Sequence, residues 1–109
     1  EFLDVLNRFP RLKVIGAHLG CWSNWAQGVD LLKGRDQVWV DCSSSLYALS
    51  PDQARRIIRD YGADRVLFGS DYPMWDAGEE RKRLDALGLT PDEMDKILGL
   101  NAQALLGIA

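Results

Sequence analysis

Cysteine and histidine are scarce in this sequence, which has two cysteines and one histidine among 109 residues. Two cysteines are too few for a disulfide scaffold, and they favour a reducing, cytoplasmic setting. Cys21 and Cys42 also lack the C-x₂₋₄-C spacing of structural zinc sites. We therefore interpret both as small apolar residues rather than as part of a mixed zinc set.

Positive charge and long apolar runs are also missing. The net charge is −3 and the isoelectric point is near 5.0, whereas phosphate binding needs a surplus of Lys and Arg. No apolar run approaches the roughly 18 residues of a membrane span, and no basic stretch precedes an apolar one as in a signal peptide. We expect one domain over residues 1–109 that binds a small molecule and neither nucleic acid nor membrane.

The chain does contain a repeated alternation of short apolar runs and helical patterns. The apolar runs 12–17, 38–40 and 65–69 predict strands, and we expect the first to be buried. Ser50 with Gln53, and Thr90 with Glu93, are the partners of two predicted capping boxes. Asn101 is predicted to cap a last short helix. The apolar spacing further predicts helices within residues 2–9, 22–34, 51–62, 78–87 and 91–98.

Strands separated by helices of this length cannot pair as hairpins, so the pattern predicts an α/β fold with parallel strands. The strand centres lie near Val14, Trp39 and Leu67, about 25 to 28 residues apart along the chain. A TIM barrel repeats eight βα units of roughly 30 residues. The chain therefore accounts for about three βα units.

Active sites of parallel α/β folds lie at the carboxyl ends of the strands, where His18, Asp41 and Asp71 are predicted to fall. His18 is either a metal ligand or general base, or a histidine that only binds a neighbouring loop. Asp71 directly follows an apolar strand and needs a metal, a cationic partner or a capping role, because an unpaired carboxylate there is costly. Asp41 either caps the following turn or belongs to the site.

Serine and tryptophan residues follow these same strands. The run 43–45 lacks a G-x-S-x-G elbow, so we do not expect a serine nucleophile. Ser43 is instead a candidate for binding the substrate. Trp22 and Trp75 are either core residues or walls of the substrate pocket, and we include both as candidate substrate-binding residues.

Three segments carry a family resemblance: KVIGAHLG (13–20), WVDCSS (39–44) and RVLFGSDYP (65–73). Together with NAQALLG (101–107), they resemble the amidohydrolase-related family of metal-dependent hydrolases. That branch of the amidohydrolase superfamily also contains aminocarboxymuconate-semialdehyde decarboxylase and related decarboxylases. The G-S-D-Y-P segment is the most specific part of the resemblance.

The resemblance implies a (β/α)₈ barrel with a divalent metal, which we expect to be zinc, at its carboxyl face. His18 matches the histidine at the end of the sixth strand, which handles a water or substrate proton. Asp71 matches the acid at the end of the eighth strand, which binds the metal and shuttles a proton. The paired histidines of the first strand and the histidine of the fifth have no counterpart. The chain is therefore expected to be the carboxyl-terminal part, strands 6–8, of such a barrel.

These features predict a metal-dependent hydrolase that attacks a small amide, ester or lactone with an activated water. One alternative is a metal-dependent non-oxidative decarboxylase. A carboxylate substrate, as in decarboxylation, favours a nearby cation. No Arg directly follows His18 or Asp71, and this favours hydrolysis. Another alternative is a fragment without catalytic role. The isolated fragment is expected to be inactive and to self-associate into a homo-oligomer.

Overall fold

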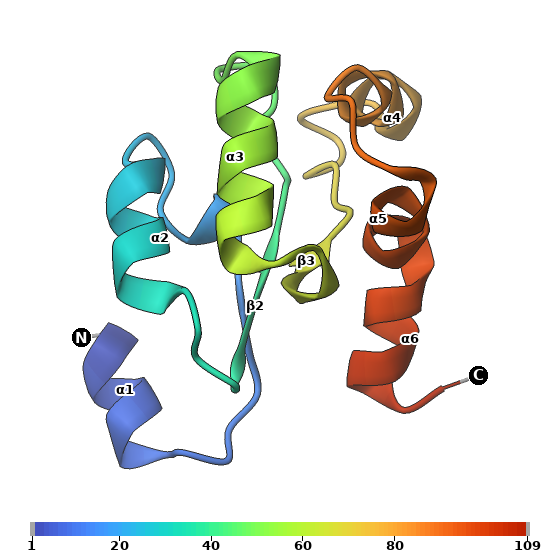
Figure 1. Cartoon of the computed structure of the whole chain (residues 1–109). Helices are drawn as coiled ribbons and strands as arrows, with labels where there is room; N and C mark the ends of the chain where they lie inside the picture. Colours follow the sequence, from blue (N-terminus) through green and yellow to red (C-terminus); the bar gives the residue numbers. More distant parts are fainter. Residues whose placement is uncertain (1, 109) are drawn as a thin grey trace.

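Three short parallel strands form the centre of the computed structural model, which describes residues 2–108 (Figure 1). Helices α2 and α3 lie against one side of these strands, and the run from α5 to α6 lies beside β3. The elements are α1 (Phe2–Arg8), β1 (Val14–Gly16), η1 (His18–Gly20), α2 (Trp25–Leu32), β2 (Val38–Asp41), α3 (Pro51–Tyr61), η2 (Ala63–Arg65), β3 (Val66–Leu67), α4 (Ala77–Asp85), α5 (Pro91–Asp95), η3 (Lys96–Leu100) and α6 (Asn101–Leu106).

The strands pair in chain order, β1 with β2 and β2 with β3. Val14 pairs with Val38, and Val40 pairs with Val66. A helix lies between each strand and the next, as parallel pairing requires. The expected α/β fold with three parallel βα units is confirmed, and the shared strand direction brings three strand ends to one edge.

The helix starts follow the capping signals of the sequence. Ser50 and Gln53 form a complete capping box at the start of α3, and Thr90 and Glu93 form another at the start of α5. Each box satisfies backbone N–H groups that have no partner within the helix. Both predicted capping boxes are confirmed.

The prediction for Asn101 is wrong. Its backbone angles are helical, because α5, η3 and α6 form one continuous helical run. Its side-chain amide instead donates to the carbonyl oxygens of Ala63 (2.6 Å) and Val66 (2.8 Å). Asn101 therefore ties the last helical run to β3.

The core lies between the sheet and the helices that cover one of its faces. Val38 and Val40 of β2 point into this core, whereas Trp39 and Asp41 alternate to the other face and are only partly buried. The expectation that the first strand is buried is wrong, because Ile15 on the uncovered face is 49% exposed. Within residues 2–108, no helix combines the length and apolarity needed to cross a membrane.

Candidate active site

The turns that follow the three strands share an unusual backbone conformation. His18, Ser44 and Asp71, one from each turn, have φ angles of 57°, 48° and 58°. These values lie in the left-handed region, which costs most non-glycine residues roughly 1–3 kcal/mol and is concentrated at functional sites. Only two other described non-glycine residues have positive φ, namely Leu19 and Ser23. The strain therefore marks the carboxyl edge of the sheet.

A hydrogen bond from helix α3 fixes the turn that follows β1. His18, Leu19 and Gly20 all have positive φ, and the Leu19 carbonyl accepts a 2.9 Å hydrogen bond from the Tyr61 hydroxyl. Gly20 has no room for a side chain, because an added Cβ would lie 2.7 Å from the Tyr61 oxygen. The buried Leu19 side chain and this hydrogen bond fix the direction in which the chain leaves His18.

The His18 ring is oriented by the turn after β2. Its Nδ1 lies 3.1 Å from the backbone oxygen of Ser43 and 2.9 Å from the Ser43 hydroxyl. A carbonyl oxygen only accepts, so this contact requires the proton on Nδ1. The Ser43 hydroxyl in turn donates to Oδ1 of Asp41. In this tautomer, Nε2 has a free lone pair for a proton or a cation.

Asp41 caps the turn that follows it, which is one of the two roles that the sequence left open. Its Oδ1 accepts from the backbone N–H of Ser43 (3.0 Å), which caps the turn, and from the backbone N–H of His18 (3.2 Å). It is therefore a link between two turns of the site rather than a member of the pocket wall.

Asp71 lies exposed at the end of the turn after β3. Its Oδ2 accepts a 2.7 Å hydrogen bond from the Ser44 hydroxyl, and its backbone carbonyl closes a turn with the N–H of Met74 at 2.8 Å. The described contacts of the carboxylate involve Oδ2, which leaves Oδ1 available for a cation or a substrate.

His18 and Asp71 line one pocket of about 410 Å³, as their shared position after apolar strands predicts. Trp22 and Trp75 also line it. Ser43 does not, because its hydroxyl lies behind the histidine ring and is held by Asp41. The pocket is lined by His18, Trp22, Ser44, Tyr47, Asp71, Met74 and Trp75.

The sequence analysis missed Ser44, Tyr47 and Met74. Strand alternation could not have indicated Ser44, because its φ of 48° lies in the left-handed region. The turn directs Ser43 to the histidine and Ser44 to Asp71. Tyr47 lines the pocket and stacks on Trp75, whose ring centroid lies 4.7 Å away with the planes 26° apart.

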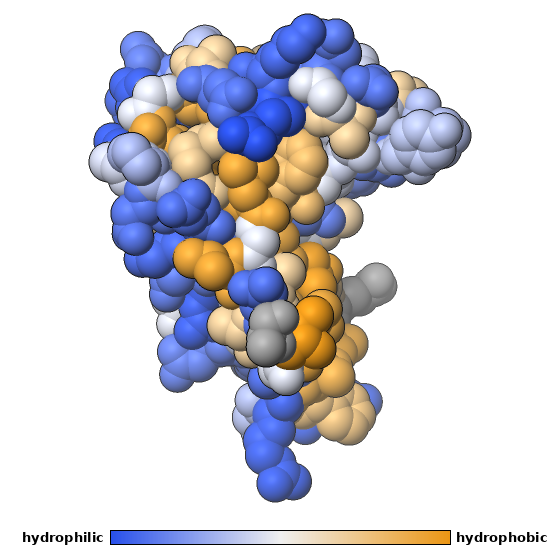
Figure 2. All heavy atoms as spheres, turned by 90° about the vertical axis from the view of Figure 1, so that its right-hand side faces the viewer, coloured by the Kyte–Doolittle hydropathy of each residue, from blue (hydrophilic) through white to orange (hydrophobic). Residues whose placement is uncertain are grey.

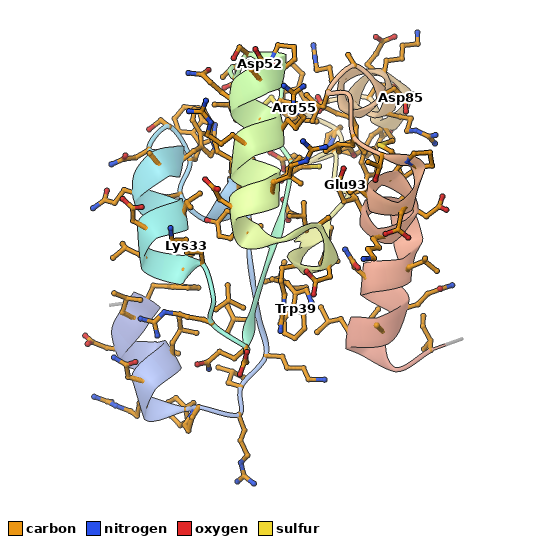
Figure 3. All side chains as sticks on the ribbon, viewed as in Figure 1. Lys33, Trp39, Asp52, Arg55, Asp85 and Glu93 are labelled. Carbon is orange, nitrogen blue, oxygen red and sulfur yellow. The ribbon has the colours of Figure 1, made fainter. Side chains whose placement is uncertain are left out.

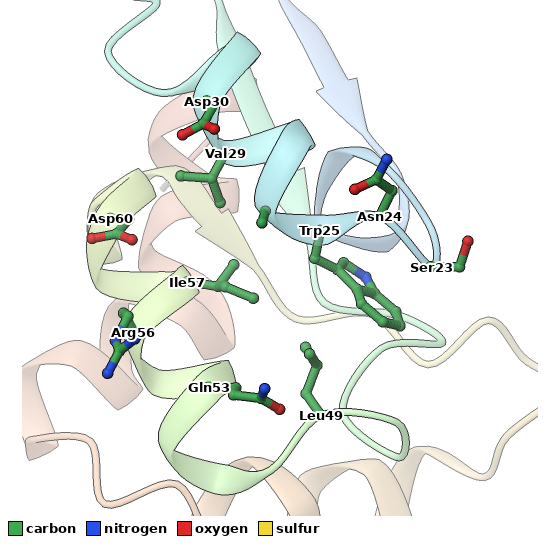
Figure 4. Close-up of a pocket in the computed structure, with 11 residues that line it drawn as sticks. Ser23, Asn24, Trp25, Val29, Asp30, Leu49, Gln53, Arg56, Ile57 and Asp60 are labelled. Carbon is green, nitrogen blue, oxygen red and sulfur yellow. The ribbon is translucent and has the colours of Figure 1, made fainter.

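A second pocket of about 410 Å³ lies between α2 and α3 (Figure 4). Figure 4 shows Val29 and Ile57 facing each other between the two helices, with Trp25 and Leu49 at one end. Neither His18 nor Asp71 lines this pocket. It is a groove of the helix layer, so the candidate active site is the pocket at the strand ends.

Metal ligands from the described residues are few. Among residues 2–108, no group of three or more His, Cys, Asp or Glu side chains is placed to hold a metal ion. Burial raises the pKa of the Cys42 thiol to about 11, which disfavours the thiolate form that binds metals. His18 and Asp71 are the two groups that offer an imidazole nitrogen and a carboxylate oxygen to the same space.

Comparison with known proteins gives the same family as the motifs. A family model described as Amidohydrolase matches residues 1–108. Among curated proteins, the chain is similar to decarboxylase orsB of Emericella nidulans, with 27% identity over 95% of this chain and 37% of that protein. The chain thus spans little more than a third of the length of this relative.

Solved structures with a similar arrangement include a TIM-barrel protein. An uncharacterised TIM-barrel protein from Bordetella bronchiseptica matches with a TM-score of 0.81 and 33% identity, over 95% of this chain and 37% of that one. A protein described as a putative 2-pyrone-4,6-dicarboxylic acid hydrolase from Pseudomonas putida matches with a TM-score of 0.72 and 27% identity, over 97% and 46%. A dihydroxybenzoic acid decarboxylase from Polaromonas, with bound manganese and an inhibitor, shares the fold (TM-score 0.68) at 20% identity, over 94% and 36%.

Proposed function

Because the chain belongs to the amidohydrolase family, we propose that it supplies His18 and Asp71 to the active site of a metal-dependent enzyme that decarboxylates a small, planar carboxylic acid. The observation that carries the proposal is the pocket at the strand ends, where these two side chains lie among aromatic rings. The activity is that of the intact protein, since the chain spans about 37% of its curated relative.

The shape of the substrate follows from the pocket wall. Trp22, Tyr47 and Trp75 line the space beside His18 and Asp71. Flat aromatic walls favour flat, unsaturated rings, which stack on them with centroids about 4.5–7 Å apart. We therefore propose a planar ring that carries a carboxylate.

The donor set fits a divalent cation. A carboxylate oxygen and a neutral imidazole suit Zn²⁺ and Mn²⁺, and the manganese-bound decarboxylase has the same fold. Asp71 would hold the cation through Oδ1. Catalytic zinc sites take three protein ligands, so the remaining ligands are proposed to come from other parts of the intact protein. When bound, the cation supplies Lewis-acid stabilisation of negative charge on the substrate.

This chain's own residues orient the substrate and move the proton. Trp75 and Trp22 hold the ring plane. Asp71 or Nε2 of His18 would first take a proton from water. As the bond from the ring carbon to the carboxylate breaks and CO₂ leaves, that proton is delivered to the ring carbon. Ser43 keeps the imidazole turned so that Nε2 is the reactive nitrogen.

Hydrolysis is the second candidate, and the sequence alone favours it. The similarity to the putative 2-pyrone-4,6-dicarboxylic acid hydrolase, at 27% identity, also supports it. In that reaction Asp71 takes a proton from water. The curated relative, a decarboxylase, puts decarboxylation first. Incubation in ¹⁸O-labelled water distinguishes the two, because hydrolysis adds the label to the product whereas decarboxylation releases CO₂.

The test of the site is Asp71→Asn in the intact protein, with Asp76→Asn as the matched control. Asn keeps the shape of Asp71 but not its ability to take and give a proton, so turnover should fall by about 10²–10⁴-fold. Asp76 caps α4 through the N–H of Glu79, and Asn caps a helix equally well, so this control should keep wild-type turnover. Near wild-type turnover of Asp71→Asn would remove Asp71 from proton transfer.

A further inference from the structure

We propose that Ser44 and Trp75 are positioning residues that set the direction of the Asp71 carboxylate. An ion pair on α4, between Glu80 and Arg83, anchors the Trp75 ring from behind the pocket. This inference rests on the proposed function, in which the Asp71 carboxylate binds the cation and transfers a proton.

The hydroxyl proton of Ser44 has one direction open to it. The indole Nε1–H of Trp75 lies 3.0 Å from the Ser44 oxygen, and an indole N–H is a donor only. Ser44 therefore accepts from Trp75, and its single proton points to Oδ2 of Asp71 at 2.7 Å. Trp75 thus directs the Ser44 proton to Oδ2 of Asp71. The other carboxylate oxygen, Oδ1, is left to bind the cation or the substrate.

Two further contacts, with Tyr47 and with Arg83, hold the Trp75 ring in place. Tyr47 stacks against the ring, and the guanidinium carbon of Arg83 lies 5.3 Å from the ring centroid. Both contacts depend on the plane of the indole, since stacking and cation–π attraction act on the ring face. Together they define the plane in which the indole N–H lies.

Glu80 fixes Arg83 in turn. Glu80 Oε1 lies 2.6 Å from an Arg83 nitrogen, and the Glu80 side chain is fully buried. Its other oxygen, Oε2, has no hydrogen-bond partner among the described residues. A buried carboxylate with one partner is a poor source of stability, because the desolvation cost offsets the attraction. We explain the buried position of Glu80 by its ion pair with Arg83, because the Arg83 guanidinium also lies over the Trp75 ring.

The first experiment is a double-mutant cycle in the intact protein with Ser44→Ala and Trp75→Phe. Ser44→Ala removes the hydrogen bond to Asp71, and Trp75→Phe removes the N–H donor that directs it. Each variant should lower kcat by up to about 10-fold, the size of one lost hydrogen bond. The double variant should lose no more than either single one, because both act through the same carboxylate. Losses that multiply to about 100-fold would overturn the proposal.

Matched controls use the same residue types elsewhere in the chain. Ser23→Ala changes a serine that also has a positive φ, of 65°. Trp39→Phe changes a tryptophan that also packs on a guanidinium, with Arg65 4.5 Å from its ring. Neither residue lines the candidate pocket, so kcat should be unchanged in both.

A spectroscopic readout tests the same link without turnover. With ¹⁵N-labelled tryptophan, the indole N–H signal of Trp75 should move in Asp71→Asn, because Ser44 accepts from the indole and donates to the carboxylate. It should also move in Arg83→Lys, which keeps the ion pair with Glu80 but lacks the planar group over the ring. The Trp39 signal should stay in place. A Trp75 signal that ignores both substitutions would overturn the proposal.

The two proposals fail in different ways. If the proposed function is wrong, the wild-type protein shows no turnover while the Trp75 signal still responds to Asp71→Asn. If the positioning is wrong, Asp71→Asn abolishes turnover while Ser44→Ala retains it.

Discussion

At the scale of single residues, the clearest contrast is between the two cysteines. Cys42 is fully buried behind the sheet, and burial raises its pKa to about 11. Cys21 is partly exposed on the turn that follows His18. Because the thiolate is the reactive form, the two thiols should differ strongly in reactivity.

We predict that, of these two thiols, Cys21 reacts rapidly at pH 8 in the folded chain and Cys42 does not. Titration with a chromogenic disulfide reagent should give a fast phase that disappears in Cys21→Ser and persists in Cys42→Ala. The second thiol should react only on addition of denaturant. Rapid reaction of Cys42 in the native Cys21→Ser variant would contradict its burial.

At the scale of secondary-structure elements, Gly34 and Gly99 have different backbone conformations, although both have open space around them. An added Cβ would contact nothing within 4 Å at Gly34 or at Gly99. Gly34 follows α2 with a φ of +76°, whereas Gly99 lies inside the helical run of η3. The same substitution therefore tests backbone conformation without a packing term.

Gly34→Ala should lower the free energy of unfolding by about 1 kcal/mol, because alanine is strained at positive φ. Gly99→Ala should raise it by about 0.5–1 kcal/mol, because alanine favours the helix. Urea unfolding of the two variants measures both values. Changes of the same sign would show that backbone conformation does not decide the outcome.

Between elements, Glu93 joins α5 to α3. Figure 3 shows its side chain between the two helices, and it accepts two hydrogen bonds from Arg59, at 3.0 and 3.1 Å. The Arg59 contact, together with the backbone N–H of Thr90, lowers the pKa of Glu93 to about 2 from its ordinary 4.5. The folded state therefore binds fewer protons than the unfolded state between these values, and the contribution of Glu93 to stability rises with pH across this window.

Glu93→Gln should remove that pH dependence. Gln retains the capping box, as Gln53 does in α3, so the substitution removes mainly the charge. The wild-type protein should be more stable than the variant above about pH 4.5, and the difference should vanish as the pH falls towards 2. Urea unfolding at pH 7 and pH 3 measures it. If wild type and variant differed in free energy of unfolding by the same amount at pH 7 and pH 3, the ion pair between Glu93 and Arg59 would be contradicted.

At the scale of the whole molecule, the apolar surface is extensive. Ile15 lies exposed on the uncovered face of the sheet, and β1 and β3 each pair with one strand among the described residues. Figure 2 shows further apolar atoms gathered on the side formed by α5 and α6, where Leu100 and Leu106 are exposed. Unpaired strand edges and large apolar patches drive association.

The 109-residue polypeptide on its own should therefore self-associate at micromolar concentration. Sedimentation velocity should show species larger than a monomer that increase with concentration. Ile15→Lys, which places a charge on the uncovered sheet face, should shift the distribution towards the monomer. A single monomeric species that unfolds cooperatively would show that the three βα units are sufficient by themselves.

Local patterns determined much of this protein. Apolar runs and capping boxes depend on neighbours within a few residues, so the caps Ser50 and Thr90 and the parallel direction of the strands were predictable. The same holds for His18 and Asp71, because the carboxyl ends of parallel strands meet at one edge whatever the rest of the chain does.

Contacts between distant segments were decided only by the tertiary structure. Asn101 resembles a cap in sequence but binds carbonyls some 35 residues away, and Ile15 reads as buried although only one face of its strand is covered. The assignment of Ser44 to Asp71 depends on a tryptophan 31 residues further on. Such pairings arise when packing brings the turns together, and no periodicity within one turn encodes the partner in another.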